Sequence, residues 1–398
     1  MNFGIVGYCS LESGILMVSR PISMEKPMSS SMQLYTEVSK QLEAFHGHID
    51  RRRLANWVWI VVGMILAKSV QLSAIANHIP DTTDAVARIA KVRRWLKNPR
   101  IDTQILYQPI ISHVLEQWAN RDVTIMLDGC FVYGDRLQMQ RLSLSHCFRA
   151  LPLVWEVVAS KGLVSLDVCE QMLDRVATLL SRTRRVTFLA DRGYRNRDWA
   201  RKCRSLNWDY IIRIANNTTI TFADGHTTTA QDLGIKPGQR RYLPGVRLTL
   251  EADWECNLAI TWTRATTKCP SELCVVMTNL HADGWVLRHY LKRMHIEESF
   301  RDDKSGGFNL DGSRLTDPKR LDALLLALAI AVLWVYELGE KVLTDKQRRT
   351  IDPGYKRQLS VFQLGWRYLH RALSCELPLA FALALHPFKP EPVRNSVS

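Results

Sequence analysis

The order of strands and helices between residues 121 and 216 constrains the fold most strongly. Five segments there are apolar and rich in β-formers, and two others have helical periodicity. In chain order they are the strands 123–130, 137–145 and 150–159, the helix 167–181, the strand 184–195, the helix 197–206 and the strand 208–216. This β-β-β-α-β-α-β order predicts an α/β domain with a mixed sheet and flanking helices.

Two of these strands end in an acidic residue. Asp128 ends the first strand, in VTIMLDGC, and Asp191 ends the fourth, in RRVTFLADRGYR. In an open α/β sheet, residues at such strand ends lie along the edge where binding sites form. Asp128 taken alone could instead cap a turn, because Gly129 follows it.

A third acid comes from the segment YLKRMHIEESFRDDKS at residues 290–305, which is predicted to be helical as far as Gly306. At about 100° per residue, one stripe of this helix carries Tyr290, Arg293, Glu297, Arg301 and Lys304. Glu298 lies roughly 100° away from Glu297, so Glu297 is the predicted third acid. The competing interpretation is a solvent-exposed helix with the ion pairs Arg293–Glu297 and Glu297–Arg301.

The charge balance indicates what such a site would act on. The chain has 53 Lys and Arg residues against 39 Asp and Glu, a net charge of +14. This balance favours a polyanionic partner, nucleic acid rather than a membrane. Carboxylates are ligands that Mg²⁺ prefers, and two such ions about 4 Å apart can activate the attacking oxygen and stabilise the leaving oxygen in phosphoryl transfer. The sequence has no P-loop.

The other potential ligands and the apolar runs have simpler interpretations. Nine cysteines without CxxC or Cys/His metal spacing predict free thiols in a reducing cytoplasm. Four histidines without metal-ligand spacing are predicted to be surface or structural residues: His146, His281, His289 and His295. The apolar runs 57–67 and 323–336 are short for membrane spans, so we expect buried helices and no membrane.

The N-terminal region is predicted to be helical from 33 to 105. Its segments 72–80 and 84–98 have the proportions of a helix-turn-helix. The second helix is predicted to dock through Ala85, Ile89, Val92 and Leu96 and to present Lys91, Arg93, Arg94 and Lys97 outward. Lys91, Arg94 and Lys97 are therefore candidate DNA contacts, although a helical bundle with a basic outer face would have the same pattern.

These patterns divide the chain into five parts, with residues 217–284 distinguished by their Thr-rich and turn-rich strands. The parts are a poorly structured leader at 1–31, a helical DNA-binding domain at 32–120, a catalytic domain formed by 121–216 and 285–336, a β-strand insertion at 217–284, and a helical C-terminal region with a loose tail at 337–398.

The strand order, the acids in MLDG and FLADRGYR, the β-insertion and the spacing of Tyr290, Arg293, Glu297 and Lys304 resemble the DDE transposases of bacterial insertion sequences. The resemblance is to the group with the Tyr-Arg-Glu-Lys (YREK) signature. It implies a ribonuclease H-like catalytic domain, with the insertion placed before the last catalytic helix, and two Mg²⁺ ions that Mn²⁺ can replace. By position, it assigns metal binding to Asp128, Asp191 and Glu297, and contacts with the DNA backbone to Tyr290, Arg293 and Lys304, with Arg301 on the same face.

The resemblance also implies partners and a reaction. The partners are double-stranded DNA, as the inverted-repeat ends of an element and as target, and a second copy of the chain in the synaptic complex, in the bacterial cytoplasm at the nucleoid. A tryptophan of the insertion is expected to stack on a flipped base and stabilise a hairpin intermediate. Trp254, Trp262 and Trp285 are candidates for this role, and each could instead belong to the core of the insertion.

Two other functions remain open at this point. A ribonuclease H-like nuclease or resolvase would share the acids but would not join strands. A DNA-binding regulator with a silent catalytic domain would share the basic charge but would not cleave DNA in Mg²⁺.

Overall fold

The centre of the molecule is one mixed sheet. The computed structural model describes residues 29–159, 164–194, 197–248, 255–263, 265, 270–379, 381–388 and 390. The ten strands of the sheet lie in the order β3-β2-β1-β4-β5-β10-β9-β8-β6-β7. Their bounds are β1 Asp122–Val132, β2 Leu137–His146, β3 Arg149–Val158, β4 Arg185–Ala190, β5 Asp209–Ile214, β6 Thr219–Thr221, β7 Thr227–Thr229, β8 Arg240–Leu248, β9 Glu255–Trp262 and β10 Leu273–Thr278.

The first five strands form the predicted ribonuclease H-like arrangement. β1 and β2 are antiparallel, as are β2 and β3, whereas β1, β4 and β5 run parallel to one another. Each connection that leads to the next parallel strand contains a helix, because parallel neighbours need a crossover connection. α6 lies between β3 and β4, and α7 lies between β4 and β5. The element order predicted from residues 121–216 is confirmed.

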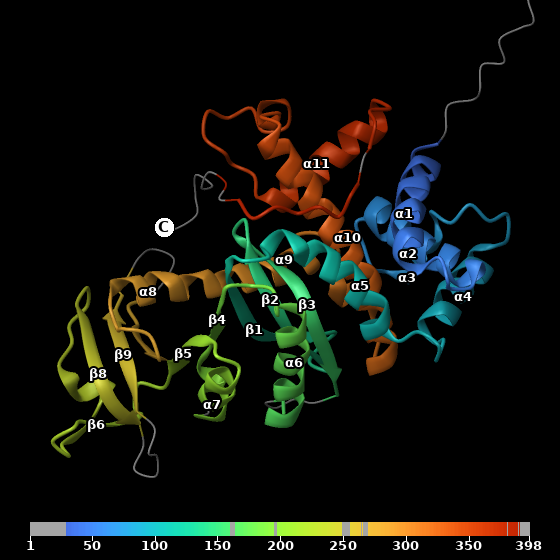
Figure 1. Cartoon of the computed structure of the whole chain (residues 1–398). Coiled ribbons are helices and arrows are strands. Elements are labelled where there is room, and N and C mark those ends of the chain that lie inside the picture. Colours follow the sequence, from blue (N-terminus) through green and yellow to red (C-terminus); the bar gives the residue numbers. More distant parts are fainter. Residues whose placement is uncertain are drawn as a thin grey trace, which may run out of the picture.

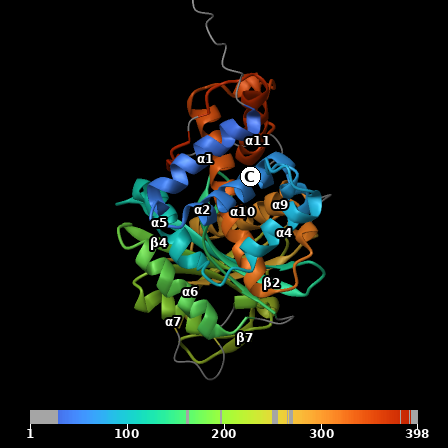
Figure 2. The same ribbon diagram turned by 90° about the vertical axis from the view of Figure 1, so that its right-hand side faces the viewer.

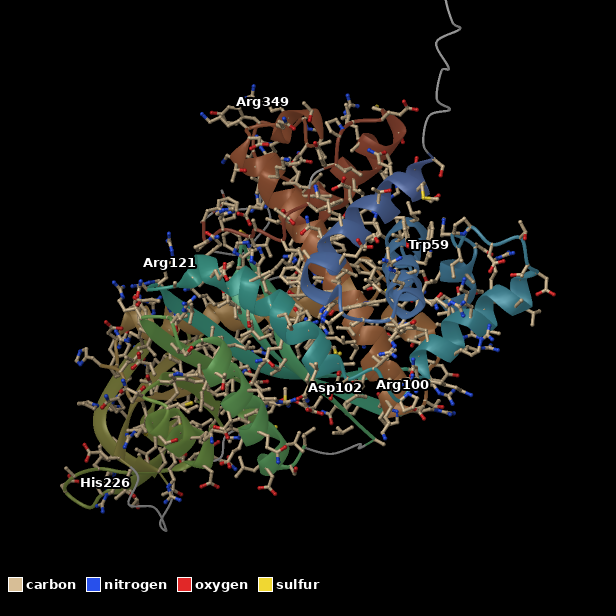
Figure 3. All side chains as sticks on the ribbon, turned by 45° about the vertical axis from the view of Figure 1, so that its right-hand side comes forward. Trp59, Arg100, Asp102, Arg121, His226 and Arg349 are labelled. Atoms are coloured by element: carbon tan, nitrogen blue, oxygen red, sulfur yellow. The ribbon has the colours of Figure 1, made fainter. Side chains whose placement is uncertain are left out.

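The predicted β-insertion extends this sheet. β10 pairs antiparallel with β5, and β9, β8, β6 and β7 follow outward. The strands of the insertion therefore do not form a separate sheet, because their backbone groups continue the hydrogen-bonded ladder of the catalytic strands. Figure 1 shows this part, with β8 and β9, projecting to one side of the molecule. Figure 3 places His226, in the β6–β7 turn, far from Arg349, which follows α10.

Helices cover the sheet and build the N- and C-terminal regions. They are α1 Ser30–His46, α2 Arg51–Ala67, α3 Leu72–Ala76, α4 Ala85–Leu96, α5 Thr103–Leu115, α6 Leu166–Leu179, α7 Arg197–Ser205, α8 Gly284–Tyr290, α9 Met294–Asp303, α10 Pro318–Thr344 and α11 Val361–Ser374. α10 contacts α2, α4 and α5 on one side, α11 on another, and β3 of the sheet (Figures 1 and 2). The long helix therefore ties the helical regions to the catalytic strands.

The two apolar runs lie in buried helices, as predicted. Run 57–67 belongs to α2, and run 323–336 lies within α10. By length and composition α10 could cross a membrane, but 89% of its most apolar window is buried inside the fold. Its start is well defined, because Asp317 caps the backbone N–H of Arg320 and Pro318 occupies the first turn.

The prediction that residues 290–305 form one regular helix is wrong in one respect. A 3₁₀ turn at Leu291–Arg293 separates the seven residues of α8 from α9. A 3₁₀ helix has three residues per turn, whereas an α-helix has about 3.6. Side chains before and after the 3₁₀ turn are therefore rotated relative to the positions they would have on one regular α-helix. The stripe predicted from Tyr290 to Lys304 is therefore interrupted near its start, between Tyr290 and Met294.

Candidate active site

Asp128 and Asp191 lie side by side at one edge of the sheet. β1 and β4 are parallel neighbours whose last paired residues are Leu127 and Ala190, so the two acids immediately follow that pair. Each carboxylate accepts a hydrogen bond from the next backbone N–H, Asp128 from Gly129 at 2.8 Å and Asp191 from Arg192 at 2.7 Å. The prediction that Asp128 ends its strand is wrong, because β1 continues to Val132 in its pairing with β2, whereas Asp191 does follow the end of β4. The two carboxylates are adjacent because the parallel pairing of β1 with β4 stops immediately before them.

Because Gly129 has no side chain, the side chain of Gln140 can lie against β1 next to Asp128. A Cβ placed on Gly129 would lie 2.3 Å from Nε2 of Gln140, the residue opposite it in β2. Oε1 of the same Gln140 accepts a hydrogen bond from the Tyr194 hydroxyl, in the turn after Asp191. Sequence reasoning missed Gln140 and Tyr194, which together connect the two acid-bearing strand ends across the sheet.

Arg293 joins the third acid to this edge. Its Nη1 donates to Oδ2 of Asp128 at 3.2 Å, and its Nη2 donates to Oε1 of Glu297. The guanidinium is buried, with 9% of Arg293 exposed. The predicted ion pair between Arg293 and Glu297 is confirmed, and the same arginine also brings Glu297 of α9 close to Asp128 of β1.

The electrostatics of Asp128 reflect the crowding of these acids. Burial, with smaller contributions from the charges of Glu297 and Asp191, raises the pKa of Asp128 to about 6, although Arg293 and the Gly129 N–H oppose the shift. Asp191 also acts on the pKa of Arg293, so all three carboxylates lie within electrostatic range of one another. A bound cation would favour the ionised form of Asp128.

The donor set fits a hard divalent cation in its chemistry. Three carboxylates from β1, β4 and α9 offer oxygen ligands, which Mg²⁺ prefers. In the described part of the chain, however, no group of three or more candidate ligands is close enough to hold a metal ion as it stands. Arg293 lies between Asp128 and Glu297, so metal binding requires this guanidinium to leave the two carboxylates.

The remaining residues of the predicted stripe have different environments. Tyr290 is 8% exposed, and its buried hydroxyl has no hydrogen-bond partner in the described residues. Lys304 Nζ donates to the Phe131 carbonyl at 2.6 Å and lies 3.5 Å from Asp311. The side chain of Arg301 is 64% exposed. The residues of the stripe therefore do not share one solvent-exposed face of the helix.

The predicted pair Glu297–Arg301 is wrong. Arg301 pairs with Glu298 instead, at 2.8 Å, and Glu298 also lies 3.7 Å from Arg149. Glu297 is instead engaged by Arg293, which leaves Arg301 to pair with Glu298. Glu298 thus pairs with Arg301 and Arg149, whereas Glu297 is joined to Asp128 through Arg293.

The inner face of α9 carries a buried polar network that sequence reasoning missed. Asp303 accepts a hydrogen bond from Arg141 at 2.5 Å, and Asp302 accepts one from Arg149 at 2.6 Å. Burial raises the pKa of Asp302 to about 6, although Arg149 opposes the shift. The two arginines belong to β2 and β3, about 150 residues earlier in the chain, so the spacing within 290–305 gives no signal of these pairs.

The candidate tryptophans also differ in their environments. Trp254 lies outside the described residues. Trp262 is partly buried at the end of β9, and its Nε1 has no hydrogen-bond partner in the described residues. Trp285 is 44% exposed, and its ring stacks on His289 with 4.3 Å between centroids. Trp285 is the candidate whose ring is accessible.

The basic helix α4 follows the prediction only in part. Its buried residues are Val92, Trp95 and Leu96, whereas Ala85 is exposed, so the predicted docking stripe does not extend to the first turn. Trp95 takes over the docking role by stacking on Trp57 of α2. Arg94 and Lys97 are exposed, as predicted, but Lys91 is partly buried, with its Nζ 3.6 Å from Asp81.

The fold and the acids define the class of the protein. The framework of a ribonuclease H-like protein is a sheet whose first five strands have this arrangement, with one acid within β1, one directly after β4 and one on the later helix α9.

The comparison with protein families narrows this class. Residues 166–334 match the family model described as Transposase DDE domain. The matched region includes Asp191 and Glu297 and begins after Asp128. The match supports a DDE transposase.

Similarities to individual proteins add little. Among solved structures, the crystal structure of Marinitoga piezophila Argonaute in complex with 5′ OH guide RNA is similar, with 10% identity, a TM-score of 0.26, and coverage of 63% of this chain and 40% of that chain. A similarity this low informs neither the fold nor the function. No curated protein sequence matches the chain significantly.

Proposed function

We propose that the chain is a DNA transposase of the YREK group. It binds the inverted-repeat ends of an element, cleaves them, and joins the 3′ ends to target DNA by Mg²⁺-dependent phosphoryl transfer through a hairpin. The proposal is carried by one observation: Asp128 and Asp191 immediately follow the last paired residues of the parallel neighbours β1 and β4, and Arg293 joins Glu297 to the same place. The family match over residues 166–334 supports it independently.

Asp128, Asp191 and Glu297 are the residues that would hold the cations. Two bound Mg²⁺ ions, or Mn²⁺ in their place, would activate the attacking oxygen and stabilise the leaving oxygen. Arg293 would then be released from the carboxylates to a phosphate of the scissile strand, because a guanidinium binds phosphate through the same fork of N–H groups. Tyr290, Arg301 and Lys304 would contact the neighbouring backbone.

Recognition of the element ends would involve surfaces away from the acids. Arg94 and Lys97, with a smaller contribution from Lys91, would contact the DNA from α4. Trp285 is the best candidate for stacking on a flipped base because its ring is exposed. Cutting two ends in one event requires two active sites, so a homodimer is expected in the synaptic complex.

The decisive experiment incubates the purified chain with labelled element ends and Mg²⁺ and maps the cleaved, hairpin and joined products. Asp128→Asn, Asp191→Asn and Glu297→Gln should each abolish cleavage while end-binding in a gel shift stays near normal. Glu298→Gln is the matched control, since Glu298 pairs with Arg301 and Arg149 instead of the acid site, and it should remain active within a few-fold.

The same assay separates the alternative functions. Cleavage without any joined product would indicate a ribonuclease H-like nuclease or resolvase. DNA binding without Mg²⁺-dependent cleavage would indicate a regulator. A fully active variant at any one of the three acids would remove that residue from the proposed site.

A further inference from the structure

Three polar side chains converge on one point beside Gly284, at the start of α8. A Cβ placed on Gly284 would lie 3.3 Å from Nη1 of Arg288, 3.3 Å from the Tyr242 hydroxyl and 3.8 Å from Nη1 of Arg240. We call these three residues the Arg240–Tyr242–Arg288 cluster. All three are classed as exposed, and 37% of Tyr242 is accessible. Glycine leaves the space between them open.

The arrangement follows from the local backbone. Arg240 and Tyr242 are two residues apart on β8, so their side chains emerge on the same face of the strand. Arg288 follows Gly284 by four residues, which brings its side chain over the first turn of α8. Figure 1 shows α8 lying across the end of β8 and β9, where these two faces meet.

Among the residues that the structure describes, the guanidinium groups of Arg240 and Arg288 form no ion pair, whereas those of ten other arginines do. The nearby carboxylate of Asp283 is already used, since its Oδ1 accepts hydrogen bonds from the backbone N–H groups of Trp285 and Val286. Two like charges directed at one point, together with a hydroxyl donor, make a site that an anion would complete.

We propose that the Arg240–Tyr242–Arg288 cluster binds one phosphodiester group of a DNA strand that leads to the acid site. Guanidinium and hydroxyl groups are donors that match phosphate oxygens. A strand is favoured over free phosphate because the site is open to solvent and is connected to Arg293 of the acid site by α8 and the 3₁₀ turn. The proposal rests on the proposed function and adds a contact to it that lies outside the YREK residues.

For a strand that runs parallel to α8, the length of the helix gives the expected position of that phosphate. Gly284 precedes Arg293 by nine residues along α8 and the 3₁₀ turn, which is roughly 14 Å at the rise of an α-helix. That distance corresponds to about four base pairs of B-form DNA, at about 3.4 Å per pair. The contacted phosphate should therefore lie about four positions from the cleaved bond.

The test measures DNA affinity of the full chain by fluorescence anisotropy across a salt series. Arg240→Ala and Arg288→Ala should each weaken binding of a labelled duplex carrying one element end about tenfold, because a charged hydrogen bond is lost. Each should also reduce the slope of log K against log salt by about 0.7–0.9. Tyr242→Phe should weaken binding about threefold and leave the slope unchanged, since no charge is removed. Arg288→Lys should keep the slope and lose only part of the affinity.

Arg184→Ala is the matched control. This arginine is 69% exposed and lies at the start of β4, on the opposite edge of the sheet from the acids. A second measurement places a single uncharged methylphosphonate at successive linkages of the duplex. The wild-type chain should lose affinity most at one linkage about four positions from the cut, and the double variant Arg240→Ala/Arg288→Ala should be insensitive to that substitution.

Each outcome bears on one of the two proposals. If the cluster variants bind with the affinity and salt slope of wild type or of Arg184→Ala, or if wild type does not bind the duplex, the cluster is not a DNA site. If millimolar inorganic phosphate displaces the strand only from chains with an intact cluster, and no single linkage is sensitive, the site takes free phosphate and the strand proposal is overturned. If the cluster variants lose affinity as expected but wild type never cleaves in Mg²⁺, the site stands and the proposed function fails.

Discussion

The ion pair between Arg141 and Asp303 should contribute several kcal/mol to the stability of the catalytic domain. Its side chains are 6% and 3% exposed, and Nη1 of Arg141 lies 2.5 Å from Oδ2 of Asp303. Arg141 also stacks on Phe300, at 4.4 Å from the ring centroid. Removing one partner leaves the other charge buried, which costs about 3–5 kcal/mol. We expect this loss of unfolding free energy in both Arg141→Met and Asp303→Leu.

The double variant should behave differently from the sum of the single variants. Replacing a buried pair by apolar groups of similar volume is often neutral or stabilising, so Arg141→Met/Asp303→Leu should recover most of the lost stability. The small cavity of about 10 Å³ beside the pair, lined by Leu325 and Leu328, leaves some space for the new side chains. The coupling energy from this double-mutant cycle should therefore be large and favourable to the pair.

The pH dependence gives an independent check on the same pair. Burial raises the pKa of Asp303, and Arg141 opposes that shift. Without Arg141 the carboxyl should take up a proton more readily, so the destabilisation of Arg141→Met should decrease as the pH falls. The destabilisation of Asp303→Leu should not, because the carboxyl that titrates has been removed.

The assay is urea unfolding followed by circular dichroism and by tryptophan fluorescence, whose coincidence would support a two-state analysis. Asp122→Asn is the control, since its pair with Arg184 is 52% and 69% exposed and should matter little. The reasoning would be refuted if either single variant at Arg141 or Asp303 cost less than about 1 kcal/mol, a loss typical of exposed pairs. Strictly additive losses in the double variant would also refute it.

Three further predictions concern the acid site and the DNA contacts. The pKa of Asp128 is raised to about 6 from 3.8, so the folded state binds its proton more tightly than the unfolded state does. The free energy of unfolding should therefore fall as the pH rises from about 4 to 6. Thermal melts of Asp128→Asn should lack this pH-dependent component. In Arg293→Ala, Mg²⁺ should bind the DNA-free protein more tightly than in wild type, because no guanidinium competes for the carboxylates; unchanged affinity by calorimetry would show that Arg293 does not compete. Arg94→Ala/Lys97→Ala should reduce the slope of log K against log salt for DNA binding by the equivalent of about two released counterions. Lys91→Ala should reduce it by less, because Lys91 already pairs with Asp81. Equal effects of the two variants in a salt titration would contradict this ranking.

The parts of the fold that sequence reasoning predicted depend on local signals. The strands β1 to β5 were predictable because each is a short apolar segment bounded by turns or helices. Asp128 and Asp191 were predicted as site residues because each follows a run of apolar residues, although only Asp191 comes after the end of its strand and Asp128 lies within β1. Their adjacency follows from the parallel pairing of β1 with β4, which the sequence alone does not state.

The parts that were missed depend on contacts between distant segments. The 3₁₀ turn at Leu291–Arg293 has the same good helix formers as its surroundings, and the burial of Arg293 against Asp128 is a tertiary contact. Ala85 lies on the predicted face but is exposed, because α4 docks through its second half, where Trp95 packs on Trp57 of α2. The strands of 217–284 were recognised, but their attachment to β5 through β10 depends on edge pairing, which has no local signature.

The position of Arg293 explains why acids and bases are crowded into residues 290–305. Three carboxylates at one sheet edge repel one another, and burial makes that repulsion costly, as the raised pKa of Asp128 indicates. A guanidinium between Asp128 and Glu297 offsets part of this cost. A divalent cation would offset it as well, but a cation and a guanidinium in the same place would repel each other. The carboxylates should therefore exchange one positive partner for the other, and a DNA phosphate within reach would stabilise the released Arg293. By linkage, anything that holds Arg293 away from the acids favours metal binding, and metal binding favours the phosphate contact to the same extent.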